Sequence, residues 1–273
     1  MRTISGPAVT RGGACPPGLA RLRRPLRIVE RNLHVYRRGW IYFVSGFLEP
    51  FFYLLSIGIG LSHLVGGVRV GDHVVSYTLY VAPGLLASSA MNGAIFDTTY
   101  NLFYKLKVAH TYDAVLATPL GTGDVALGEI GWALARGVTY AAAFLGVMAA
   151  LGLVGSPWAI LCLPGAALVS LAFAASGMAA TSYMKSWQDL DGIFLAMLPM
   201  FLFSGTFYPL AVYPGALADL VRITPLYQGV ALLRALDTGT VSWSLLWHVA
   251  YLVALAGLGA VLTARRLRRL LAP

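Results

Sequence analysis

Six long apolar runs, separated by short polar segments, constrain the fold of this chain more than any other feature. Each run reaches the ~20 residues that an α-helix needs to cross a bilayer. Apolar residues make up 58% of the 273 residues and charged residues only 11%, about half the charged share of a soluble domain. The sequence therefore excludes a soluble globular protein and predicts an all-α membrane protein with six transmembrane helices. The predicted spans are residues 41–64, 77–99, 127–151, 158–184, 192–212 and 243–264.

Basic residues are distributed unevenly between the two sides that six spans define. Sixteen of the twenty Lys and Arg residues lie in the two termini and in the loops after the second and fourth spans. The opposite side carries Arg69, Arg222 and Arg234. Since Lys and Arg gather on the cytoplasmic side of a membrane, we expect both termini to be cytoplasmic, in a bacterial inner membrane. The net charge of +9 then reflects orientation rather than nucleic-acid binding.

The basic segment before the first span has the pattern of an amphipathic helix. Apolar residues recur every three or four positions along one helix face, and arginines cover the rest. We expect this helix, at residues 22–40, to lie in the cytoplasmic interface with its stripe in the acyl chains; the alternative is a plain basic flank. Residues 1–21 are expected to form a flexible tail, and residues 22–273 one transmembrane domain. The stripe consists of Leu22, Leu26, Val29, Leu33, Tyr36 and Trp40.

Two further segments are not simple spans. The cytoplasmic loop at residues 100–124 is too polar to cross a membrane, and it can hold a short helix from Ala109 to Leu116. That helix is either a docking element for a cytoplasmic partner or a plain connection. The outer segment at residues 205–236 is apolar, but its breaks predict re-entrant half-helices or a long loop rather than a span. The breaks are Pro209, Pro214, Pro225 and Gly229.

Four ionisable residues fall within the predicted spans: Glu49, Asp97, Glu129 and Arg136. Such residues are rare in membranes and usually face the bundle interior in pairs. Glu129 and Arg136 share a helix face but lie too far apart to pair directly. We expect each to have a partner on another helix, with Glu49 beside Arg136. The pair either fixes helix packing or contacts substrate.

The sequence contains no pattern that indicates an enzyme. It lacks a nucleotide-binding GxxxxGK[ST] loop, an HExxH motif and any Cys or His spacing typical of metal sites. Ser176 and His248 resemble the dyad of an intramembrane protease only poorly, because their predicted depths differ by ~20 Å at ~1.5 Å per residue. No catalytic, cofactor-binding or metal-binding residue is therefore predicted.

Five motifs, in order, resemble the membrane subunit of type-2 ABC exporters, in the branch that includes nodulation-factor and anthracycline exporters. The resemblance runs from about residue 20 to the end of the chain. The motifs are Ala82-Pro83-Gly84-Leu85-Leu86, YDAVLATPL from Tyr112, Gly128-Glu129 with Arg136, FSGTFYPL from Phe203, and Thr224-Pro225-Leu226-Tyr227 with Leu233-Arg234.

The resemblance implies a role for each unusual segment. Residues 22–40 correspond to the connecting helix, and the loop helix to a coupling helix that docks on a separate cytoplasmic ATPase. The coupling residues are Tyr112, Asp113, Leu116, Thr118 and Pro119. The outer half-helices correspond to a gate that closes the exit, with Gly205, Phe207, Tyr208, Pro209 and Pro225.

The resemblance also implies the partners and the activity. Two permeases, identical or related, work with two ATPases, which bind the ATP and magnesium; this chain carries no cofactor. The assembly exports an amphiphile, namely a drug or antibiotic, a lipid, or a glycolipid or polysaccharide. The alternatives are a secondary transporter, whose inverted repeats and midplane ion site are not visible in the sequence, and an assembly scaffold.

Overall fold

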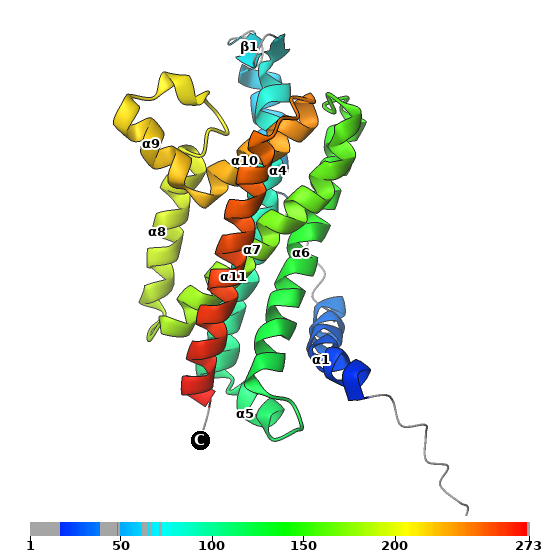
Figure 1. Ribbon diagram of the computed structural model, residues 1–273, viewed down its shortest axis with the longest axis vertical. Helices are drawn as coiled ribbons and strands as arrows, with labels where there is room; N and C mark the ends of the chain where they lie inside the picture. The colour runs from blue at the N-terminus through cyan, green and yellow to red at the C-terminus, as the bar shows by residue number, and fades with distance from the viewer. Residues whose placement is uncertain are drawn as a thin grey trace, which may run out of the picture.

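The computed structural model describes residues 17–38, 48, 50–61, 65, 67–70 and 73–271. Long helices run between one end of the molecule that carries the β-strands and α9 and another that carries α5 and the C-terminus (Figure 1). The elements are α1 (Pro17–Arg38), η1 (Ile57–Leu61), β1 (Gly67–Val70), β2 (His73–Ser76), α4 (Tyr77–Phe96), η2 (Asp97–Asn101), η3 (Tyr104–Val108), α5 (Thr111–Leu116), α6 (Thr122–Ala150), η4 (Pro157–Leu161), α7 (Cys162–Tyr183), α8 (Gln188–Leu202), η5 (Leu210–Val212), α9 (Gly215–Ile223), α10 (Pro225–Thr238) and α11 (Ser244–Leu271).

Four helices in the described part of the chain are long and apolar enough to cross a membrane. They are Tyr77–Val108, Thr122–Ala150, Pro157–Tyr183 and Ser244–Leu270, which match the second, third, fourth and sixth predicted spans. The first of them extends beyond its prediction because α4 continues into the π-helical turns η2 and η3. Threonine hydroxyls bond back to backbone carbonyls at this junction, Thr98 to Ala94 at 3.0 Å and Thr99 to Ile95 at 2.7 Å.

The first and fifth predicted spans differ from this pattern. The first lies partly outside the described residues; residues 50–56 within it are helical and lead into η1. The fifth, given as residues 192–212 with its end near Gly205, corresponds to α8, which ends at Leu202, just before that glycine. Gly205 follows with a φ of +73°, a left-handed conformation that glycine adopts without strain and that turns the chain away from the helix axis.

Small residues allow the central helix to approach its neighbours closely. α7 packs against α4, α6 and α11, and it is lined by buried Ala172, Ala174 and Ala175. A Cβ atom added to Gly259 on α11 would lie 2.6 Å from the backbone carbon of Ala175. Close contact between helix backbones is how membrane helices gain packing energy where lipid provides no hydrophobic drive.

A short β-hairpin in the first outer loop departs from the all-α expectation. β1 and β2 pair antiparallel, with Val68 opposite Val75 and Arg69 opposite Val74. The valines on both strands favour extended structure. The hairpin leads directly into α4, whose first turn is capped by the Ser76 hydroxyl, which accepts from the N–H of Leu79 at 3.3 Å.

α1 runs along the cytoplasmic half of α6 (Figure 1). Leu26 and Leu33 of the predicted lipid stripe are about half exposed, at 54% and 52%, as a membrane-facing stripe requires. Tyr36 does not follow the prediction, because it turns inward and bonds with α6 and η2. The inward-facing line is instead Ile28, Asn32 and Tyr36, spaced four residues apart along one helix face, with Ile28 and Asn32 buried and Tyr36 half-buried.

The outer segment forms two short helices as its prolines predict. α9 and α10 meet at Thr224 with a bend of 85°. Pro225 occupies the first turn of α10, where its missing N–H costs nothing. Gly229 does not break the chain as predicted; it lies inside α10, where a Cβ would come within 2.8 Å of Val169. Its role is close packing against α7.

Candidate functional site

Glu129 connects three other segments at the cytoplasmic end of α6. Its Oε1 accepts from Arg31 Nη2 of α1 and from the hydroxyl of Tyr112 in α5, both at 3.1 Å. Its Oε2 accepts from Asn32 Nδ2 at 3.0 Å and from Lys105 Nζ of η3 at 2.8 Å. Both oxygens are thus fully used in a buried site, which makes this Glu129 cluster a firm junction.

Tyr112 attaches the loop helix α5 to the rest of the molecule. Its ring is 1% exposed, and burial, with the nearby Glu129 carboxylate, raises the pKa of its hydroxyl well above the usual value. Tyr112 therefore stays a hydrogen-bond donor at physiological pH. Asp113, Thr118 and Pro119 are exposed on the cytoplasmic surface, and Leu116 is half-buried. The helix is thus anchored by one residue and presents most of the others outward.

Arg136 forms a second cluster two turns further into the membrane on α6. Its Nη1 pairs with Asp97 Oδ1 at 3.0 Å, and its Nε and Nη2 donate to the hydroxyl of Tyr140. Tyr36 of α1 donates to the same Asp97 oxygen at 2.8 Å, and Asn101 donates to both Asp97 and Tyr36. This Arg136 cluster therefore joins α1, η2 and α6.

The predicted partnership of Glu49 with Arg136 lies outside the described residues. The structure gives Arg136 and Glu129 partners from other helices, with Asp97 as the carboxylate beside Arg136. The guanidinium also lies 5.1 Å from the ring centre of Phe96. A paired charge surrounded by aromatic rings is a tolerable arrangement for an arginine at membrane depth.

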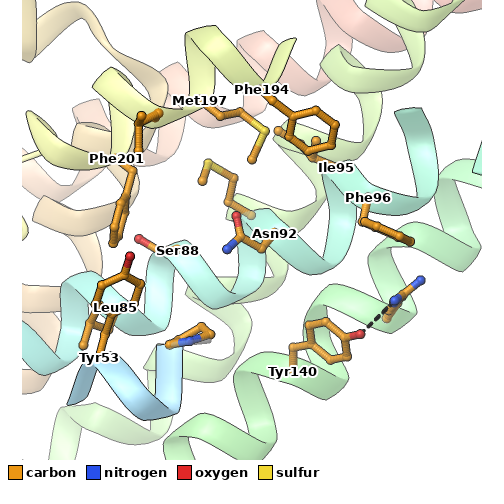
Figure 2. A pocket seen from close by; sticks show the side chains of 14 residues that line it. Tyr53, Leu85, Ser88, Asn92, Ile95, Phe96, Tyr140, Phe194, Met197 and Phe201 are labelled. Atoms are coloured by element: carbon orange, nitrogen blue, oxygen red, sulfur yellow. Dashed lines mark hydrogen bonds between the residues drawn. The ribbon is translucent and has the colours of Figure 1, made fainter. Parts of the chain in front are cut away.

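A cavity of about 380 Å³ lies between α4, α6, α8 and residues 50–53, within the size range of ligand sites. Figure 2 shows Phe194, Met197 and Phe201 of α8 on one side and Ser88 and Asn92 of α4 on the other. Aromatic and methionine side chains make an adaptable apolar wall.

The polar part of the cavity wall comes from few residues. Asn92 points its amide into the space (Figure 2) and has no hydrogen-bond partner among the described residues. Arg136 and Tyr140 line the cavity from α6, so these two members of the Arg136 cluster are part of the wall. An apolar space with a few polar groups suits a ligand that has both an apolar and a polar part.

Gly205, one of the residues predicted to form an outer gate, lies beside Arg234 of α10. Its Nη2 donates to the carbonyl of Gly205 at 2.8 Å and its Nε to that of Tyr80 at 3.2 Å, and the guanidinium stacks on the Tyr80 ring at 3.9 Å. The Tyr80 hydroxyl donates to the same Gly205 carbonyl, at 3.1 Å. These contacts fix the turn after α8 against the start of α4.

The other predicted gate residues are spread over the same region. The Phe207 carbonyl accepts from the Tyr77 hydroxyl at 3.1 Å. Tyr208 is exposed, Pro209 precedes η5, and Pro225 starts α10. His248, expected at the interface beside Trp243 and Trp247, bonds through Nδ1 to Gln228 and so joins α11 to α10.

Sequence reasoning missed the residues that connect the clusters. Asn32 and Tyr36 fell on a helix expected to face lipid, and Tyr140 and Asn92 drew no notice inside apolar spans. The spacing of Ile28, Asn32 and Tyr36 carries the available signal, because a polar residue within a buried helix line marks a face turned toward protein.

Comparisons with known proteins agree with this architecture. The family model described as ABC-2 type transporter matches residues 26–237. Nodulation protein J of Rhizobium leguminosarum bv. trifolii is 34% identical over 252 residues, 89% of this chain and 94% of that protein. Nodulation protein J of Rhizobium meliloti (strain 1021) is 32% identical over 253 residues, 91% and 94% of the two chains.

A more distant relative is described as a transport permease. Inner membrane transport permease YadH of Escherichia coli (strain K12) is 24% identical over 207 residues, 73% of this chain and 77% of that protein. The family model alone covers well over half of the chain. The chain therefore belongs to the ABC-2 type transporter family, as a multi-pass permease subunit of the inner membrane whose ATPase is a separate chain.

Proposed function

We propose that this permease works as a dimer that exports an amphiphile from the cytoplasm, through the cavity beside α4 and with α5 docked on the ATPase. The observation that carries the proposal is the cavity of about 380 Å³, walled by phenylalanines and methionines and supplied with Asn92 and Arg136. An apolar chain fits the walls, and a polar head group fits the amide and the guanidinium.

The depth of the polar groups gives the ligand a direction. Arg136 pairs with Asp97 just beyond the inner end of α4, whereas Phe201 lies near the outer end of α8. The head group of a bound molecule would then lie toward the cytoplasm, with its tail toward the outer leaflet. The candidate substrates, a glycolipid, a lipid and an apolar drug, share this two-part chemistry.

The shape of α5 supports its assignment as the ATPase-docking helix. Asp113, Ala114 and Pro119 are exposed at the cytoplasmic end, while Tyr112 anchors the helix on Glu129. A short helix that is firmly anchored and exposed on one face can transmit a movement of the ATPase to the permease without unfolding.

The exposed apolar face of α8 supports the dimer in this proposal. Leu190 is its buried residue, and Leu195 and Leu198 are 74% and 58% exposed beside the cavity. A second copy packed on this face would close the cavity from the side, as the resemblance to two-permease exporters implies.

Transport in proteoliposomes tests the export function. The permease and its ATPase are reconstituted together with a nitrobenzoxadiazole-labelled phosphatidylethanolamine as the probe. We expect ATP-dependent movement of the probe only when both chains are present. Movement without the ATPase, or undiminished movement after Asn92→Trp fills the cavity, would contradict the proposal. Val253→Trp, on the exposed face of α11, is the matched control and should transport normally.

Docking is tested separately by co-purification. Ala114→Arg places a large charge on the exposed face of α5 and should release the ATPase from the tagged permease. Ala216→Arg makes the same change on exposed α9 and should retain it. Equal recovery of the ATPase with both variants would contradict the docking role of α5.

A further inference from the structure

We propose that α1 links the cavity to the ATPase-docking helix, with Tyr36 as the positioning residue through which cavity occupancy alters how α5 is held. The inference rests on the proposed function, because it takes the cavity as the ligand site and α5 as the docking helix. It adds a regulatory connection between them that neither site shows when considered alone.

Both clusters lie on one face of α6 and share one helix as a partner. Glu129 and Arg136 are two turns apart, and α1 bonds the first through Asn32 and the second through Tyr36. Between them the Tyr36 ring packs on Trp132, with ring centres 5.2 Å apart. α1 is thus fastened to α6 at two points along the same line.

The contact at Gly128 keeps α1 close enough for both attachments. A Cβ at Gly128 would lie 2.7 Å from Ile28 Cβ and 2.9 Å from the Pro25 carbonyl. The helix therefore rests on the α6 backbone. A helix held this closely moves as a body, so a displacement at Tyr36 reaches Asn32, one turn away.

The two attachments differ in how completely their polar groups are satisfied. Both Glu129 oxygens accept two bonds each. At Asp97, Oδ1 accepts from Tyr36, Asn101 and Arg136, while the buried Oδ2 has no partner in the described part of the chain. A carboxylate with one crowded and one empty oxygen has a second arrangement available, in which a donor shifts from one oxygen to the other.

The cavity reaches the less satisfied attachment directly. Phe96, Arg136 and Tyr140 line it, and Arg136 and Tyr36 bond to the same Asp97 oxygen. A ligand that contacts Arg136 or Tyr140 therefore competes with the arrangement that holds Tyr36. At the other end, Asn32 and Tyr112 bond to the same Glu129 carboxylate, so the movement of α1 reaches α5.

Thermodynamic linkage makes this connection measurable. If probe binding alters ATPase docking, then ATPase docking must alter probe binding by the same factor. The experiment uses the purified full-length permease in lipid nanodiscs, the nucleotide-free ATPase and the labelled phosphatidylethanolamine. The Kd of the probe is measured with and without the ATPase, and the Kd of the ATPase with and without the probe.

In the wild-type permease we expect each ligand to change the Kd of the other by the same factor, about fivefold or more. In Tyr36→Phe we expect this factor to be close to one. That variant removes one hydroxyl and keeps the ring on Trp132, so each Kd measured alone should stay near the wild-type value. Tyr104→Phe removes a hydroxyl from a ring that is 50% exposed and should keep the wild-type factor.

Other results would overturn either the linkage through α1 or the cavity as the ligand site. A wild-type factor of one, or a Tyr36→Phe factor equal to that of wild type, overturns the linkage through α1 while leaving export intact. A probe that fails to bind the wild-type permease overturns the cavity as the ligand site, and the linkage with it. Asn32→Leu removes one of the two bonds from α1 to Glu129, the other coming from Arg31. It gives an independent check and should also lower the factor.

Discussion

Arg136 and Arg234 both hold a positive charge inside the helical bundle, but they do so by opposite means. Arg136 pairs with the carboxylate of Asp97 at 3.0 Å. Arg234 donates to the backbone carbonyls of Tyr80 and Gly205 and stacks on the Tyr80 ring, and within the described residues it forms no ion pair.

The difference shows what each end of the molecule can do. At the cytoplasmic end the acceptors are side chains, which can change rotamer and exchange partners. At the outer end the acceptors are backbone atoms, which move only if the turn at Gly205 or the start of α4 moves. The inner region is therefore suited to switching, and the outer region is suited to holding the segment after α8, the predicted gate, in one place until α8 or α10 shifts as a body.

Removing the carboxylate beside Arg136 is expected to have the largest effect. Asp97→Ala leaves a buried guanidinium without its charge partner, which costs about 3–5 kcal/mol. We expect a lower melting temperature and a lower yield of folded permease in detergent. Because Arg136→Met removes the charge that has lost its side-chain partner, adding it to Asp97→Ala should recover part of the loss. A double variant that melts below both single variants would contradict the pairing.

Removing Arg234 is expected to have a somewhat smaller effect. Arg234→Met removes charged hydrogen bonds, but the Gly205 carbonyl keeps the Tyr80 hydroxyl as a donor and no unpaired charge is left. We therefore expect a total loss of about 1.5–3 kcal/mol. Melting should show a loss that Arg234→Lys repairs only in part, since Lys lacks the planar fork. If Arg234→Lys melts like the wild type, the backbone-bonded description of the outer end is wrong.

A tight contact between α4 and the turn after α8 gives a third test. A Cβ at Gly84 would lie 2.7 Å from Thr206 Cγ2 and 3.0 Å from Thr206 Cα. Gly84→Ala should therefore destabilise the permease by about 1–3 kcal/mol through overpacking. Adding Thr206→Ala should relieve part of this in a melting experiment. Gly123→Ala, where a Cβ would meet nothing within 4 Å, is the control and should show no clash.

Removing one hydroxyl from the Glu129 cluster should have the smallest effect. Tyr112→Phe deletes one bond and leaves Glu129 three donors, so we expect a loss of about 0.5–1.5 kcal/mol. The permease should melt slightly earlier and retain less ATPase during a long wash. Tyr183→Phe, at a ring that is 54% exposed, should be neutral in both measurements. A loss as large as that of Asp97→Ala would remove the distinction between the two clusters.

Several parts of this arrangement follow from local sequence patterns. The spans at α4, α6, α7 and α11 were predictable because long apolar runs have one stable form in a bilayer, the helix. The bend between α9 and α10 was predictable from Pro225. The end of α8 was also predictable to within a few residues from Gly205, which adopts a left-handed conformation just after Leu202.

The site residues likewise divide into those that the sequence identifies and those that only the structure identifies. Glu129 and Arg136 stand out in sequence because charge is rare at membrane depth. Their partners do not, since Asn32 and Tyr36 lie 97 and 100 positions away along the chain. Tyr36 in particular fits a lipid-facing stripe as well as a buried one, and only the rotation of α1 on α6 decides between them.

The sequence by itself determined that this chain spans a membrane, which end faces the cytoplasm, and where charge must be neutralised, because hydropathy, basic residues and ionisable groups act through local transfer energies. Only the tertiary structure decided which carboxylate neutralises which cation, that the cavity shares a wall with the Arg136 cluster, and that α1 joins that cluster to α5. Those facts depend on helices that are distant in sequence and meet at small residues such as Gly128, and the packing of helix on helix is a property of the whole bundle.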